Sequence, residues 1–89
     1  MGYDAVRPGV PASARHALRL AFAAEVAERL PRLVALTDLE AARRDAHTLA
    51  SSAWVVQEPE LARLARAVED DLQGGPVDEL VARLRAWTP

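Results

Sequence analysis

The sequence contains no cysteine and no lysine, and only 4% of its residues are aromatic. Without cysteine, the chain can form no disulfide, no thiolate zinc site and no cysteine nucleophile. No apolar run approaches the ~20 residues of a membrane-spanning helix, and no stretch alternates β-branched and polar residues as a strand does. The first residues also lack the basic start and apolar stretch of a secretory signal. We therefore expect an all-α protein that resides in the cytoplasm and does not enter a membrane.

The chain is short and slightly acidic. Its 89 residues suffice for one small domain, and alanine is the commonest of the 51% that are hydrophobic, which predicts a thin, closely packed core. The net charge of −2 and the absence of a basic stripe argue against a nucleic-acid partner. The acidic residues Glu69, Asp70 and Asp71 are expected to form a solvated helix face. Because no cluster of histidines and carboxylates converges on one face, we expect no metal site and no cofactor.

Four helical segments are predicted between residues 12 and 88, which we take as one domain after a flexible lead-in of residues 1–11. The segments run from about Pro11 to Leu36, from Thr37 to Gln57, from Pro59 to Gln73, and from Pro76 to the chain end. Their short connections imply antiparallel neighbours, so the predicted fold is an antiparallel up-down four-helix bundle.

Local sequence signals define the predicted helix ends. Pro31 interrupts the apolar pattern of the first segment, but the pattern continues beyond it, which favours one bent helix over two helices. Thr37 and Glu40 have the spacing of a capping box at the start of the second segment. The pair Gly74-Gly75 is expected to end the third segment in the left-handed conformation that glycine adopts at little cost.

The second segment carries a histidine on the side away from its apolar stripe. The stripe recurs in steps of three and four along Leu39, Ala42, Ala46, Leu49, Ala53 and Val56. His47 lies about 130° from the centre of this stripe, so we expect it to face water or a partner. Arg43, Ala50 and Trp54 lie on the same flank, with Ser51 just beyond them.

A single exposed histidine suits a chemistry that requires little of its own scaffold. No serine in the sequence has an evident base and orienting group, so a conventional active site is not expected. In phosphoryl transfer, the partner protein can supply the metal and the groups that hold the phosphoryl group in place. The carrier then supplies only a neutral imidazole as the nucleophile. His47 therefore fits a phosphocarrier rather than a self-sufficient enzyme. His16 lies in the first segment without neighbouring side chains that could bind a ligand together with it. We expect it to be an ordinary surface residue.

Two groups of residues around and after His47 form a longer pattern. The first is Ala46-His47-Thr48-Leu49 with Ser52-Ala53, and the second is Leu61, Leu64, Val68 and Glu69. They resemble the histidine-containing phosphotransfer (HPt) domain, which has an A-H-x-L-K-G-S-A core followed at a fixed distance by L-x-x-L-x-x-x-L-E. The likeness covers roughly positions 15 to 87. It implies an HPt-like bundle in which His47 accepts a phosphoryl group from one receiver-domain aspartate and donates it to another.

The resemblance also implies partners and a site. The implied partners are a response-regulator receiver domain, a hybrid histidine kinase, or both, in a bacterial two-component multistep phosphorelay. The family's lysine and glycine after the histidine are replaced by Ala50 and Ser51. Arg43, one helical turn before His47, could replace the lysine as the cation that screens the phosphate. We expect Ala50, Ser51 and Trp54 to contribute to partner docking, although Trp54 could instead be half-buried against a neighbouring helix.

Two other interpretations of the sequence stay open. The missing lysine and glycine are compatible with a degenerate HPt-like module that binds a receiver or a kinase without carrying phosphate. The alanine-rich core is also compatible with a small helical dimerisation module unrelated to signalling, because small domains often gain stability by association. The principal interpretation, a phosphocarrier, predicts a monomer.

Overall fold

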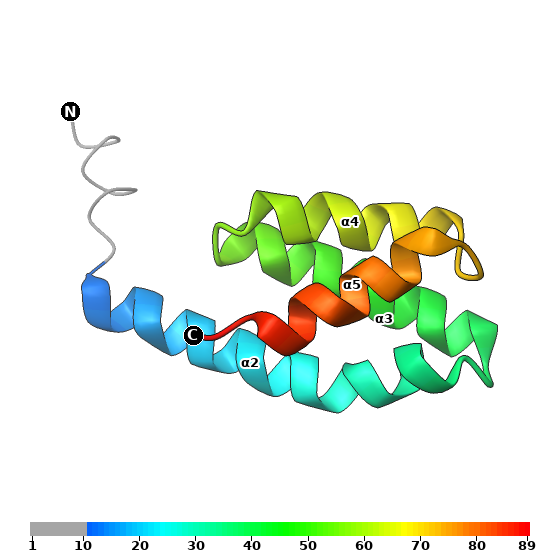
Figure 1. Ribbon diagram of the computed structural model, residues 1–89. Coiled ribbons are helices and arrows are strands. Elements are labelled where there is room, and N and C mark those ends of the chain that lie inside the picture. The colour runs from blue at the N-terminus through cyan, green and yellow to red at the C-terminus, as the bar shows by residue number, and fades with distance from the viewer. Residues whose placement is uncertain (1–10) are drawn as a thin grey trace.

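The computed structural model describes residues 11–89, and these residues form four α-helices (Figure 1). The helices are α2 (Ala12–Ala35), α3 (Leu39–Val55), α4 (Pro59–Asp70) and α5 (Gly75–Ala86). Each helix runs antiparallel to the one before it, and α5 returns to lie beside α2. The predicted all-α four-helix bundle is therefore confirmed. The lead-in predicted for residues 1–11 lies, except for Pro11, outside the described residues.

Small side chains line the contact between α3 and α4, the most extensive helix pair of the bundle. The buried alanines of the two helices are Ala42, Ala46, Ala50, Ala53, Ala62 and Ala65. Larger side chains fill the rest of the core, and the largest that are fully buried are Leu33, Leu49, Leu80 and Val68. The predicted thin core is thus present, and it brings the backbones of α3 and α4 close together because alanine leaves little between them.

Helix α2 continues through Pro31 without a break, as predicted. Proline removes one backbone hydrogen bond and leaves the carbonyl of Ala27 without its intrahelical donor. Both Pro31 and Ala27 are exposed, so water can take the place of the missing donor. The proline is tolerated because it lies on the solvent side of α2 and leaves no unpaired group in the core.

Three predictions about helix ends were wrong. Helix α3 is capped by Asp38, whose carboxylate accepts a hydrogen bond from the Ala41 N–H at 3.1 Å, and not by a capping box at Thr37. Aspartate is at least as good an N-cap as threonine. Among residues 11–89, the left-handed backbone occurs instead at Leu36, with φ 50°, and at Gln57, with φ 62°. Gly74 is instead extended and precedes α5, and α4 ends at Asp70 rather than at Gln73.

A polar cluster joins α2, the connection between α3 and α4, and the C-terminal residues at one end of the bundle. Arg19 of α2 donates to the Glu58 carboxylate at 3.0 Å and to the main-chain carbonyl of Val56 at 3.3 Å. Trp87 donates to the same carboxylate at 3.0 Å and packs edge-on against Phe22 with ring centroids 4.9 Å apart. Within residues 11–89, no helix has the length and apolar character needed to span a bilayer.

Candidate functional site

His47 lies in the middle of α3 and points away from the core. Its side chain is 66% exposed, whereas its neighbours Ala46 and Leu49, on the opposite side of the helix, are 0% and 1% exposed. The predicted orientation of His47 is therefore confirmed. His16 is also exposed, as expected of a surface residue.

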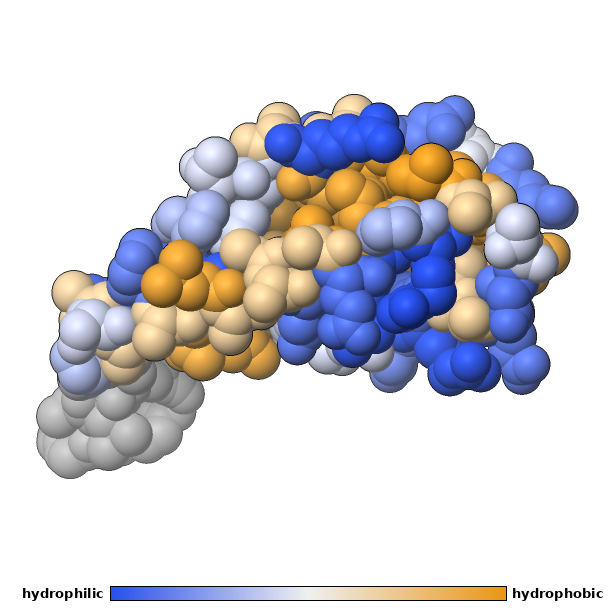
Figure 2. Space-filling model, turned by 90° about the horizontal axis from the view of Figure 1, so that it is seen from below, coloured by the Kyte–Doolittle hydropathy of each residue, from blue (hydrophilic) through white to orange (hydrophobic). Residues whose placement is uncertain are grey.

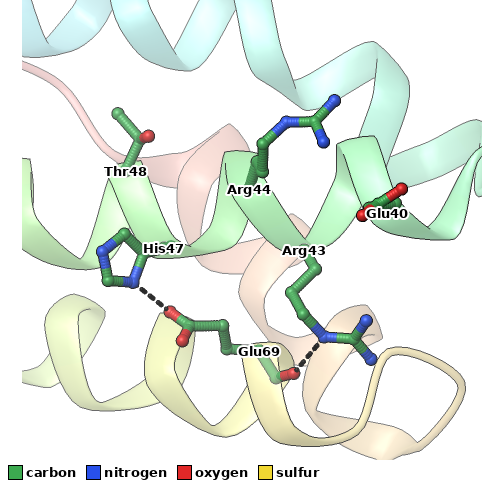
Figure 3. A pocket seen from close by; sticks show the side chains of 6 residues that line it. All are labelled: Glu40, Arg43, Arg44, His47, Thr48 and Glu69. Carbon is green, nitrogen blue, oxygen red and sulfur yellow. Dashed lines mark hydrogen bonds and ion pairs between the residues drawn. The ribbon is translucent and has the colours of Figure 1, made fainter.

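Glu69 of α4 holds one nitrogen of the His47 ring (Figure 3). The distance from His47 Nδ1 to Glu69 Oε2 is 2.9 Å. An ionised carboxylate can only accept a hydrogen bond, so the proton of this contact belongs to Nδ1. In the neutral ring the lone pair is then on Nε2, the nitrogen directed away from Glu69. The contact thus selects the tautomer in which Nε2 is free to act as a nucleophile.

The role of Glu69 was missed at the sequence level. The sequence suggested only that Glu69 belongs to a solvated acidic face, but its side chain is 22% exposed and is hydrogen-bonded to His47. Its place in the matched register after His47 was the available signal. The register alone did not show that α4 would turn this residue toward α3.

An open cavity of about 480 Å³ borders His47. It is lined by Glu40, Arg43, Arg44, His47, Thr48 and Glu69. The two arginines on this rim are balanced by the two carboxylates of Glu40 and Glu69, so the lining carries no excess of positive charge. Within residues 11–89, no group of three side chains of the metal-ligating types comes together.

The two arginines of this cavity point away from Nε2. The Arg43 Nε–H donates to the main-chain carbonyl of Glu69 at 3.2 Å, and its guanidinium lies on the opposite side of Glu69 from the imidazole (Figure 3). Arg44 extends toward α2. Arg43 therefore has to leave its present contact before it can screen a phosphate on Nε2, and that role stays a prediction.

Only two of the three predicted docking residues lie on the surface. Ala50 is 2% exposed, so its assignment to a docking surface was wrong. The close approach of α3 and α4 covers this position, because small side chains line both helices. Ser51 is exposed. Trp54 is 50% exposed, so half of its surface is available to a partner and the other half is covered by the chain itself.

Apolar side chains continue from Trp54 toward the start of α2. Val55 is 62% exposed and Leu18 is 43% exposed, and both border a small cavity of about 120 Å³ between α2 and α3. Figure 2 shows apolar side chains gathered at this end of α2, next to the start of the described chain. This face is suited to contact with a partner because it is apolar and accessible.

A second polar cluster lies on the other flank of α3. Asp45 is 3% exposed and accepts one hydrogen bond from Arg29 at 3.0 Å and two from Arg32 at 2.6 and 3.0 Å. Hydrogen bonding to Arg32 lowers the pKa of Asp45; burial opposes this shift, and hydrogen bonding to Arg29 adds to it. Because both arginines belong to α2, the cluster fixes α3 against α2, and His47 then faces the opposite way.

Comparison with known proteins assigns the family. A family model for the Hpt domain matches residues 17–88, which is most of the chain. The chain belongs to the Hpt domain family. The resemblance noted from the sequence is thereby confirmed. Hpt domains carry out histidine phosphotransfer in phosphorelays and interact there with receiver domains and kinases. No curated protein and no solved structure matches this Hpt domain.

Proposed function

We propose that His47 is the phosphoacceptor of this Hpt domain. In this proposal, His47 takes a phosphoryl group from the aspartate of one receiver domain and passes it to another. The observation that carries the proposal is an imidazole that is 66% exposed, with Nδ1 held by Glu69 at 2.9 Å and Nε2 left accessible. In this proposal, the acting form is a cytoplasmic monomer, and it takes part in a bacterial multistep phosphorelay.

The chemical step needs no proton transfer at His47. The Nε2 lone pair attacks the phosphorus of the aspartyl phosphate, the N–P bond forms, and the acyl O–P bond breaks. The electron pair of the broken bond leaves with the aspartate carboxylate. The ring becomes a phosphoimidazolium with its proton still on Nδ1, and the Glu69 carboxylate offsets its positive charge. The partner supplies the metal and the positioning of the phosphoryl group.

The docking surface for the partner extends from His47 along α3 to the start of α2. Ser51 lies one turn after His47, and its small side chain leaves room for the receiver. Trp54 lies about 10 Å farther along the helix axis than His47. A partly exposed tryptophan of this kind is a common interface hot spot. Val55 and Leu18 extend the surface beyond Trp54.

A labelling experiment tests this proposal. The chain is incubated with a receiver domain that carries radioactive phosphate on its aspartate. We expect the chain to gain a label that is labile in acid and stable in base, and the variant His47→Gln to gain none. A wild-type chain that gains no such label, or a His47→Gln chain that still gains it, contradicts the proposal.

A second candidate function is binding without phosphate transfer. It is favoured by the replacement of the family lysine with Ala50, which is 2% exposed, and by the orientation of Arg43 and Arg44 away from Nε2. This candidate predicts that no label appears and that His47→Gln leaves the affinity for the partner unchanged. Calorimetry with an unphosphorylated receiver measures that affinity directly. The family membership argues against the third interpretation, a dimerisation module unrelated to signalling.

A further inference from the structure

We propose that Arg43 is a positioning residue, which caps the C-terminal end of α4 and thereby holds Glu69 against His47. This inference rests on the proposed function, because it concerns the residue that orients the phosphoacceptor. It differs from the screening role expected from the sequence, in which Arg43 acts on the phosphate itself.

The C-terminal end of α4 carries an excess of negative charge. Glu69 and Asp70 occupy its last turn and Asp71 is its C-cap, while the last turn contains no basic residue. The helix dipole is also negative at this end, so three consecutive carboxylates are unfavourable there. In addition, the last carbonyl groups of a helix have no donor within the helix.

Arg43 supplies from α3 what α4 lacks at this end. Its Nε–H donates to the main-chain carbonyl of Glu69 at 3.2 Å, and its guanidinium brings a positive charge to the negative end of α4. Figure 3 shows the result, in which Glu69 is held at its backbone by Arg43 and at its carboxylate by His47. Arg43 and His47 are four residues apart, so they lie one above the other on α3.

The double contact gives Arg43 an influence on the tautomer of His47. If Arg43 is lost, the last turn of α4 is expected to fray, and Glu69 belongs to that turn. The Glu69 carboxylate then no longer stays beside Nδ1. The ring becomes free to carry its proton on Nε2, where the proton occupies the lone pair needed for attack on phosphorus. A screening role, by contrast, takes effect only once the phosphate is present.

The test uses the unphosphorylated chain and two measurements. Nitrogen NMR of the imidazole gives the tautomer of His47, and hydrogen exchange gives the opening of the Asp70 and Asp71 amides. For Arg43→Ala we expect exchange of these amides to rise about two- to fivefold and the Nε2–H tautomer to gain population. Arg43→Lys keeps the cation and is expected to stay near wild type. Arg44→Ala, the adjacent exposed arginine, is expected to change neither measurement.

A single result overturns this inference. If His47 in Arg43→Ala keeps the wild-type tautomer, Arg43 does not position the site, whatever the exchange rates. Arg43 is exposed, so Arg43→Ala is expected to fold, and a circular dichroism melt verifies this. Since no phosphate is present, a failure of the labelling experiment would contradict the proposed function and leave this result unaffected.

Discussion

The two flanks of α3 carry polar contacts of opposite character. Toward α2, Asp45 is 3% exposed and accepts three hydrogen bonds from two arginines. Toward α4, His47 is 66% exposed and makes one hydrogen bond, to Glu69. The two residues are only two positions apart in the chain, which places them about 200° apart around the helix. The buried contact fixes the helix, and the exposed contact leaves a nitrogen free for chemistry.

The difference has a physical basis in solvation. Removal of one partner from a buried ion pair leaves an uncompensated charge and is costly, whereas an exposed pair contributes about 0–1 kcal/mol. We therefore expect substitutions on the α2 flank to change stability and substitutions on the α4 flank to change reactivity.

Substitution of Asp45 by alanine should give the largest loss of stability. We expect the free energy of unfolding to fall by about 1.5 to 3 kcal/mol, because Arg29 and Arg32 lose their common hydrogen-bond acceptor. Urea unfolding of Asp45→Ala and of the control Asp70→Ala, which removes an exposed carboxylate, measures the loss. A change below about 1 kcal/mol for Asp45→Ala would remove the distinction between the two flanks.

The stability of the wild-type chain should depend on pH through Asp45. The pKa of Asp45 is lowered from its ordinary value of 3.8 in the folded chain, so the unfolded chain binds the proton more readily. The contribution of Asp45 is complete above the ordinary pKa and disappears as the pH falls through the lowered folded pKa. Urea unfolding between pH 6 and about 2 should therefore show a steeper decline for wild type than for Asp45→Asn. Parallel curves would contradict the assignment.

Substitution of Glu69 should affect transfer and leave stability almost unchanged. Glu69→Gln keeps an acceptor for Nδ1–H but loses the charge that offsets the phosphoimidazolium. We expect phosphoryl transfer from a receiver to slow by about 5- to 20-fold, which corresponds to a weakened charge-assisted hydrogen bond. Stopped-flow or quench-flow transfer assays give the rate, with Asp70→Asn as the matched control. A loss of more than about 2 kcal/mol in stability would instead make Glu69 a structural residue like Asp45.

Substitution of Trp54 should weaken partner binding. We expect Trp54→Ala to lower the affinity for a receiver by about 3- to 10-fold, because only the exposed half of the side chain is available to a partner. Its stability should fall by no more than about 2 kcal/mol, because half of the side chain is already in water. Calorimetric titration measures the affinity. An unchanged affinity in Trp54→Ala would place the docking surface elsewhere.

Periodicity predicted the helices and the orientation of His47 well, since the angle between residues of a helix does not depend on their neighbours. It predicted the helix ends less well. Asp38 and Thr37 are both good caps, and the pattern of apolar residues does not distinguish between them; the structure uses Asp38. The number of α3 side chains that are buried depends on how closely α4 approaches. The burial of Ala50 could therefore not be derived from the sequence of α3 alone. The contact between Glu69 and His47 is likewise a property of two helices together.

The proposed phosphotransfer requires that Nε2 of His47 accept the phosphoryl group. Phosphorus and nitrogen NMR of the chain after transfer from a phosphorylated receiver identifies the phosphorylated atom most directly. We predict a single phosphoimidazole with phosphorus on Nε2 and the ring proton on Nδ1. Phosphate on Nδ1, on another side chain or on no residue would contradict the account.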